Sequence, residues 1–434
     1  MSATMPRPSS ARSIALLTCI VTLLCGAGTA SAQTPGFQFW NAGMPGEFGD
    51  NLGDNAIEDS DGGAPLGLGI FSRKPFRFTF SVREGFDSNV YTTRYNPTRS
   101  WYTNFGAGIS YEFGSPRLQL RTNLAGGLTY YYNRPGDPVD WNGAWTLGAT
   151  YQATPRLTLS VDTTTAYLSQ PNVSILGTSS RQDGDYFYSN TSLSAAYQWS
   201  DKFSTVLAYR FGVIYYTENE INNNQGRIEQ TISLSGRYLV LPKTTGVLEY
   251  RVNPVTYFQA DMDSLGHFFL IGVDQVFNPR LTWNARVGAE LRNVDNPVDG
   301  ESIYLGPYME SNLAYQFGPA SSLGWLMRYG TEASGVYNVS QRQTFRTGLN
   351  LTHGFTRRLS GQLSADWLIN YYDQQNVISS FTENVVTFAL SLNFAVNRFT
   401  SLSAGYQYTI DVAPDAPERE YNRNVAYMGA NFSF

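Results

Sequence analysis

Cysteine and histidine, which carry much of the redox, metal and nucleophilic chemistry of proteins, are almost missing from this chain. Its 434 residues include two cysteines, Cys19 and Cys25, and two histidines, His267 and His353. Both cysteines lie in the N-terminal leader described below, so the expected mature chain has none, which excludes a disulfide framework and thiol chemistry. No Ser/His/Asp arrangement or metal-ligand cluster can be placed around either histidine. We expect no enzyme activity, no metal and no cofactor.

Long apolar runs are also absent after residue 32, so no transmembrane helix is expected. Arg7 and Arg12 precede a short apolar stretch at 14–24, and small residues at 30–32 provide a cleavage site, which together predict a signal peptide over 1–32. The alternative, an N-terminal membrane anchor, would need a longer apolar run. Without Arg7 and Arg12 the chain has 28 Lys+Arg against 35 Asp+Glu, a balance that argues against nucleic-acid binding.

The C-terminus is the most informative stretch. Apolar side chains occupy every second position of 428–434, so the chain ends inside an alternating strand. An exposed apolar edge strand is hazardous in a soluble domain, whereas a closed barrel in lipid has no edge. The ending with Gly429, Phe432 and Phe434 resembles the C-terminal assembly signal of bacterial outer-membrane barrels. This resemblance implies the barrel-assembly machinery as a partner.

From residue 76 onward, a unit of strand, long polar segment, strand and tight turn repeats about every forty residues. The alternating runs, for example 281–291, exceed ten residues, as tilted membrane strands require. The strands of a β-propeller, which has a similar period, are shorter. Eight tight turns separate nine hairpins, so residues 76–434 predict an all-β, transmembrane antiparallel barrel of 18 strands. The turns lie near positions 115, 155, 201, 243, 279, 319, 357 and 397.

An even strand count places both termini on one side, which we assign to the periplasm, with the long loops outside a Gram-negative cell. Outward aromatics at both strand ends predict two girdles in contact with outer-membrane lipid. Near the turns these are Tyr111, Phe113, Tyr151, Trp199, Phe203, Phe277, Trp283, Phe317, Trp325, Phe355 and Phe394. Toward the loops they are Tyr130, Trp145, Tyr167, Tyr215, Tyr257 and Tyr371.

The inward positions are rich in arginine, with fewer acids, and predict an electropositive channel that favours anions or hydrated polar solutes. The alternative is that arginine–carboxylate pairs brace the wall. The candidate pore-lining residues are Arg77, Arg83, Arg121, Arg210, Arg237, Arg251, Arg286, Arg292, Arg328 and Arg346, and Arg342 and Arg423 share their face. The inward acids are Asp162, Glu229, Glu249, Glu290, Glu310, Glu332 and Asp366.

Several tyrosines also face inward in this register. Their rings could stack on sugars along a carbohydrate pathway, or could simply fill space and form hydrogen bonds across the lumen. They are Tyr216, Tyr304, Tyr308, Tyr372 and Tyr427. Residues 33–75 form an acidic, Gly-rich segment that we assign to the periplasm, where it would either enter the lumen or act as a disordered tether.

The stretch 83–91, Arg-Glu-Gly-Phe-Asp-Ser-Asn-Val-Tyr, and the repeated Pro-Arg-Leu turns resemble those of a bacterial family of outer-membrane β-barrel porins, the second such porin family. The likeness covers 76–434. It implies an outer-membrane channel or scaffold, often associated with exopolysaccharide production, and it transfers no site residues.

The sequence thus predicts a porin-like channel in the bacterial outer membrane that passes small polar solutes, with anions and carbohydrates as the candidate classes. A non-conducting accessory of exopolysaccharide export and a surface hydrolase built on a barrel are the two alternatives.

Overall fold

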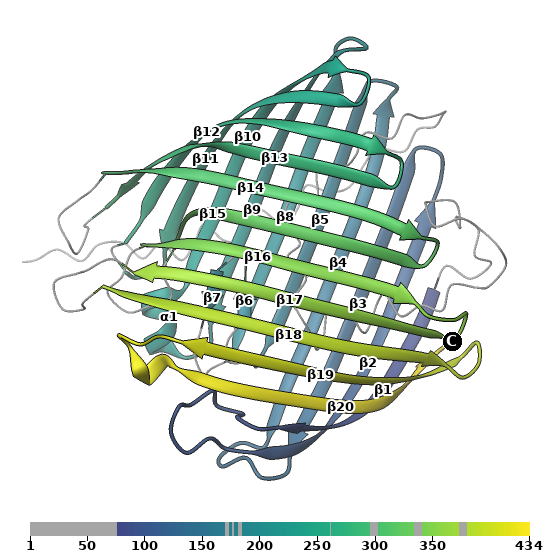
Figure 1. Ribbon diagram of the computed structural model, residues 1–434, viewed down its shortest axis with the longest axis vertical. Helices are drawn as coiled ribbons and strands as arrows, with labels where there is room; N and C mark the ends of the chain where they lie inside the picture. Colours follow the sequence, from purple (N-terminus) through teal and green to yellow (C-terminus); the bar gives the residue numbers. More distant parts are fainter. Residues whose placement is uncertain are drawn as a thin grey trace, which may run out of the picture.

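The computed structural model describes residues 76–169, 173–175, 178–180, 185–260, 262–295, 303–333, 341–372 and 380–434. Within these ranges, eighteen strands form one closed antiparallel sheet, as predicted (Figure 1). They are β1 (Phe76–Asp87), β2 (Ser100–Gly114), β3 (Leu118–Tyr131), β4 (Val139–Thr154), β5 (Leu157–Leu168), β8 (Tyr186–Gln198), β9 (Phe203–Tyr216), β10 (Arg227–Leu241), β11 (Thr244–Tyr257), β12 (Ser264–Asn278), β13 (Leu281–Val294), β14 (Ile303–Gly318), β15 (Ser321–Ala333), β16 (Gln341–Gly354), β17 (Leu359–Tyr372), β18 (Phe381–Ala395), β19 (Thr400–Val412) and β20 (Tyr421–Ser433).

Three smaller elements lie in the long connections. A short hairpin of β6 (Val173–Ile175) and β7 (Thr178–Ser180) follows β5, the helix α1 (Asn219–Gln225) joins β9 to β10, and the 3-10 turn η2 (Pro417–Arg419) joins β19 to β20. No helix in the described ranges is long and apolar enough to cross a membrane. The predicted signal peptide and the acidic segment 33–75 lie outside the described residues.

The barrel closes where the first strand meets the last. β1 pairs with β2 on one side and with β20 on the other, in a register that sets Phe80 opposite Phe432. Their rings stack with centroids 6.4 Å apart. The final alternating residues of the chain therefore complete the sheet, and the main-chain groups that an edge strand would leave exposed are paired.

All eight predicted tight turns are confirmed, and local side chains explain how the backbone reverses. Between β2 and β3, Ser115 N donates to Leu118 O at 2.7 Å and Leu118 N donates to Ser115 Oγ at 3.0 Å. Between β18 and β19, Asn397 Oδ1 accepts from the backbone N–H groups of Phe399 and Thr400 at 2.8 and 3.1 Å. These short polar side chains stabilise the reversal by taking the place of ladder hydrogen bonds.

Burial along each strand is inverted relative to a soluble protein. In β11, Leu248 is 68% exposed, whereas its neighbours Glu249 and Arg251 are 3% and 6% exposed. Apolar side chains on the outside and charged side chains on the inside are what a barrel in lipid requires. We call the inward positions the inner wall, and we call the two ends of the strands the turn end and the loop end.

Both predicted aromatic girdles occur on the outward face, with one exception. Trp199 and Phe355 at the turn end and Tyr215 at the loop end are exposed. Tyr257, predicted to face outward, lies buried on the inner wall, and the Arg227 guanidinium is 6.0 Å from the centre of its ring. The prediction was wrong because Tyr257 is six residues from Arg251, and residues an even number apart share a face of the strand.

Candidate functional site: the inner wall

The ten predicted pore-lining arginines all occupy inner-wall positions in the strand register. Arg77 and Arg83 lie on β1, and Arg286 and Arg292 on β13. The other six lie on different strands: Arg121 on β3, Arg210 on β9, Arg237 on β10, Arg251 on β11, Arg328 on β15 and Arg346 on β16. Side chains on a concave wall converge, so these groups can meet partners from strands that are not neighbours.

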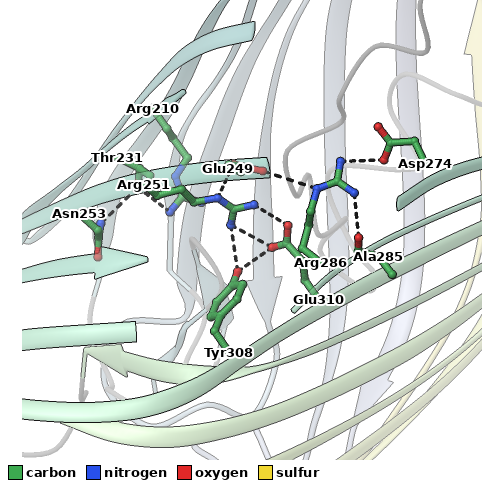
Figure 2. Close-up of polar contacts among 10 residues, drawn as sticks. All are labelled: Arg210, Thr231, Glu249, Arg251, Asn253, Asp274, Ala285, Arg286, Tyr308 and Glu310. Carbon is green, nitrogen blue, oxygen red and sulfur yellow. Dashed lines mark hydrogen bonds and ion pairs between the residues drawn. The ribbon is translucent and has the colours of Figure 1, made fainter. Parts of the chain in front are cut away.

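The best-defined meeting point is the β11–β14 network, which consists of Glu249, Arg251, Asp274, Arg286, Tyr308 and Glu310 (Figure 2). Arg251 Nη2 lies 2.5 Å from Glu310 Oε1, although β12 and β13 separate their strands. Arg251 Nε donates to Glu249 Oε1 at 2.6 Å, and Arg251 Nη1 donates to the Tyr308 hydroxyl at 3.1 Å. The Tyr308 hydroxyl in turn donates to Glu310 Oε2 at 2.6 Å.

Arg286 extends this network along the wall. Its Nη2 donates to Asp274 Oδ1 at 2.7 Å, its Nη1 donates to Ala285 O at 2.8 Å, and its Nε lies 3.6 Å from Glu249 Oε2. Arg237 Nη1 approaches Asp274 Oδ2 at 4.0 Å. With Arg237 included, three guanidinium groups face three carboxylates, so the network as a whole is neutral.

A second cluster of charged side chains lies on β15 and β16, the strands that follow β14 around the barrel. Glu332 is within 3.4–3.5 Å of Arg328, Arg342 and Arg346. On β13, Arg292 Nε donates to Glu290 Oε1 at 2.7 Å, and Glu290 Oε2 also accepts from Thr331 N at 3.2 Å. These contacts tie β13, β15 and β16 together across the inner face.

The connection between β19 and β20 folds onto the wall and is held there by an ion pair. Arg419 Nη2 lies 2.7 Å from Glu383 Oε1 on β18. Ala413 and Ala416 are buried against Tyr372 and Phe381. Burial disfavours the charge of Arg419, but the charge of Glu383, followed by Tyr372, outweighs it and raises the pKa of the Arg419 guanidinium above its ordinary value. This ion pair, which we call the loop latch, ties the β19–β20 connection to β18.

The inner wall is balanced in charge. Its described strands carry thirteen arginines, Arg77, Arg83, Arg121, Arg210, Arg227, Arg237, Arg251, Arg286, Arg292, Arg328, Arg342, Arg346 and Arg423. They also carry thirteen acids, Asp87, Glu112, Asp140, Asp162, Glu229, Glu249, Asp274, Glu290, Glu310, Glu332, Asp366, Glu383 and Asp411. The surplus of arginine predicted from the sequence is therefore wrong.

Most of the inward acids that the sequence analysis missed lie close to the end of a strand. There it was hard to decide from the sequence which face of the strand a residue occupies. Asp87 ends β1 and is paired with Arg423 of β20. Glu383 is the third residue of β18, and Asp411 the penultimate residue of β19. Strict alternation counted from the middle of each strand would have found them.

The two ends of the inner wall differ in chemistry. The buried charges and aromatics described above lie mainly in the loop-end half. In the turn-end half hydroxyl and amide side chains predominate, including Gln119, Asn123, Thr146, Ser160, Ser192, Asn312, Asn350 and Gln362. Near this end, the ion pair of Arg121 and Glu112 has side chains that are 70% and 66% exposed. The wall is thus accessible and polar at the turn end and closely packed at the loop end.

The five predicted inward tyrosines all lie on the inner wall. Tyr216, Tyr308 and Tyr372 are buried by packing, Tyr216 against Tyr186 and Ile214, Tyr308 against Phe268. Tyr304 on β14 and Tyr427 on β20 are half-buried. The space-filling alternative accounts for the first three, while Tyr427 borders a hollow that we describe below.

The two histidines lie on the outward face of different strands. His267 Nδ1 is 2.8 Å from the Tyr250 hydroxyl, and His353 Nδ1 is 2.8 Å from Ser321 Oγ. Within the described residues no carboxylate or amide is bonded to the other nitrogen of His353, and no group of three or more His, Cys, Asp or Glu side chains could hold a metal. In the part of the chain that the structure describes, no third group of a hydrolase triad is joined to the Ser321–His353 pair.

These features, a closed 18-stranded barrel with apolar outer and charged inner faces, agree with the family comparison. A family model described as "Putative beta-barrel porin 2" matches residues 75–434. The chain belongs to this family. The porin accordingly lies in the bacterial outer membrane, and the likeness inferred from its opening strand and its turns is confirmed.

No curated protein matches the porin. Solved structures that resemble it include OccK9 (OpdG) of Pseudomonas aeruginosa, at 10% identity over 83% of this chain and 98% of that chain, with a TM-score of 0.44. OccAB4 of Acinetobacter baumannii matches at 11% identity, 83% and 98% coverage and a TM-score of 0.42. Pseudomonas aeruginosa OpdK with vanillate matches at 7% identity, 83% and 99% coverage and a TM-score of 0.43.

Proposed function

We propose that this porin is a passive channel for small hydrated solutes, with neutral polar molecules such as carbohydrates favoured over ions. The long loops face the outside of the cell and both termini face the periplasm. The observation that carries the proposal is the inner wall itself: thirteen arginines balanced by thirteen acids, with a turn-end half of hydroxyl and amide side chains.

A barrel of this strand number is wide enough to leave an aqueous passage. Charges of both signs lie close together along its wall, and ten of the thirteen arginines are within 4.0 Å of a carboxylate. The fields of such pairs largely offset each other, and salt screens what remains beyond about one Debye length. This charge balance does not support the preference for anions that was predicted from the sequence. The closely spaced hydrogen-bond donors and acceptors of the wall instead suit solutes that form many hydrogen bonds.

The test is planar-bilayer conductance of purified, refolded protein. The proposal expects stepwise ohmic openings and, under a salt gradient, a reversal potential close to zero. Liposome swelling in isotonic sugar should show that uncharged solutes enter. Protein that is folded by heat-modifiability but gives neither conductance nor swelling would reject the channel and favour the alternative of a non-conducting accessory in exopolysaccharide export.

A further inference from the structure

A hollow lies in the inner wall beside the seam where the barrel closes. It measures about 470 Å³, including the lumen space into which it opens. We call it the seam hollow and define it by Arg83, Tyr102, Asn104, Tyr131, Asn142 and Tyr427, which come from β1, β2, β3, β4 and β20.

The side chains of the seam hollow lie flat along the wall because glycines occupy the neighbouring strands. A Cβ atom at Gly85 would overlap the ring of Tyr102, and one at Gly429 would overlap the Arg83 side chain. The Arg83 guanidinium in turn lies 5.3 Å from the centre of the Tyr427 ring. Aromatic and guanidinium groups are thereby held as a fixed surface instead of projecting across the lumen.

The polar groups of the hollow are a mixed set of donors and acceptors. Asn104 Nδ2 donates to Thr129 Oγ1 at 2.8 Å, which fixes the Asn104 side chain. Asn142 Oδ1 is buried and accepts no hydrogen bond within the described residues. Asp140 also lines the hollow, and it is paired with Arg134 at 2.7 Å, so its charge is compensated. The hollow therefore offers an unmet acceptor in Asn142, beside aromatic surface.

We propose that the seam hollow binds a single sugar unit of a solute on its way through the lumen. A pyranose has an apolar face of C–H groups and a rim of closely spaced hydroxyls, and the hollow has the complementary aromatic rings and the polar groups of Arg83 and Asn142. A site built to bond hydroxyls rejects molecules without them, because its buried polar atoms would stay unpaired. This assignment rests on the proposed channel function and names its solute class.

The deciding variant is Asn142→Leu, which keeps the branched side-chain shape and removes the amide with its unmet acceptor. Its matched control is Asn190→Leu on β8, another inner-wall asparagine whose Oδ1 is buried without a partner in the described ranges, but outside the hollow. Tyr102→Phe, which deletes a single oxygen and keeps the ring over Gly85, provides a second variant that leaves the packing unchanged.

Glucose and glucuronate are the probes, measured by calorimetric titration of detergent-solubilised barrel and by their reduction of ion current in bilayers. Loss of one hydrogen bond should raise the half-saturation concentration of the sugar about threefold to tenfold in Asn142→Leu, with a smaller rise in Tyr102→Phe and none in Asn190→Leu. A polyethylene glycol of matched size should reduce the current equally in all variants.

Equal sugar affinity in Asn142→Leu and Asn190→Leu, or no saturable binding of either sugar to the wild-type barrel, would overturn the seam hollow as a sugar site even if ions are conducted. Asn142-dependent sugar binding to a barrel that does not conduct would leave the hollow standing and reject the channel. The titration and the current thus separate failure of the site from failure of the proposed function.

Discussion

Phe78 and Phe434 exchange backbone hydrogen bonds across the closure of the barrel. Phe78 N donates to Phe434 O at 3.0 Å, and Phe434 N donates to Phe78 O at 2.9 Å. The last residue of the chain, just beyond β20, therefore extends the pairing across the closure, and its removal leaves the backbone groups of Phe78 unpaired where β1 begins.

This pairing predicts that deletion of Phe434, or replacement of both Phe432 and Phe434 by serine, lowers the amount of folded protein in the outer membrane. The terminal strand has to close the barrel and, in our interpretation, to be recognised by the assembly machinery. The measurement is the heat-modifiable band on gels of membrane fractions. Phe317→Ser, an exposed aromatic of the same girdle away from the seam, is the control, and normal levels of the terminal variants would refute the assembly signal.

The β11–β14 network predicts a large effect on stability. Arg251→Met leaves two carboxylates, Glu249 and Glu310, on the inner wall with one guanidinium fewer. Breaking a buried ion pair from one side costs about 3–5 kcal/mol, so the free energy of unfolding should fall by that order in denaturant titrations. Arg121→Met, at the exposed pair, should change it by less than about 1 kcal/mol. Equal effects would mean that the network does not brace the wall.

The assignment of loops and turns to the two sides of the membrane predicts the accessibility of inserted tags. Tags at Gly136, Gly184 or Asn223, in long connections, should be labelled on intact cells. Tags at Ser115, Lys243 or Ala320, in the tight turns, should be labelled only after the outer membrane is permeabilised. The opposite pattern would invert the orientation without altering the strand count.

The loop latch predicts that single-channel conductance changes when Arg419 is replaced. It also predicts that the conductance of the wild-type barrel does not change when the pH is raised from 7 to 10. Arg419→Gln should release the β19–β20 connection and raise single-channel conductance or its fluctuation. Because the pKa of Arg419 is raised above its ordinary value in the folded state, its contribution is complete below that ordinary value and is lost only as the pH rises through the higher folded-state pKa. Conductance of the wild-type barrel should therefore stay constant between pH 7 and 10. A rise within that window would show that another group controls the loop.

Because the wall is balanced in charge, replacing either member of the exposed Arg121–Glu112 pair should shift the ion selectivity, in opposite directions for the two residues. Glu112→Gln leaves Arg121 uncompensated and should move the reversal potential toward anions, and Arg121→Gln should move it toward cations. Both shifts should shrink as salt screens the wall. Reversal potentials are measured under a salt gradient, and shifts of the same sign in both variants would contradict an accessible, charge-balanced turn end.

The sequence by itself determined the barrel: its closure, its strand count, its turns and the face on which each of the ten candidate arginines lies. These follow from a period of two residues and from turn chemistry, which are local properties of the chain. The same rule, applied from mid-strand, would also have placed Tyr257 on the inner wall.

Only the tertiary structure decided which residues meet across the wall. Arg251 reaches Glu310 across two intervening strands, and Arg83 lies against Gly429 at the other end of the chain. Both contacts depend on the stagger and curvature of the closed sheet, which no local pattern encodes. The predicted surplus of arginine has a different cause, because it came from acids near strand ends whose face was misassigned. In the folded wall ten of the thirteen arginines lie within 4.0 Å of a carboxylate. The seam hollow became visible only once β20 lay beside β1.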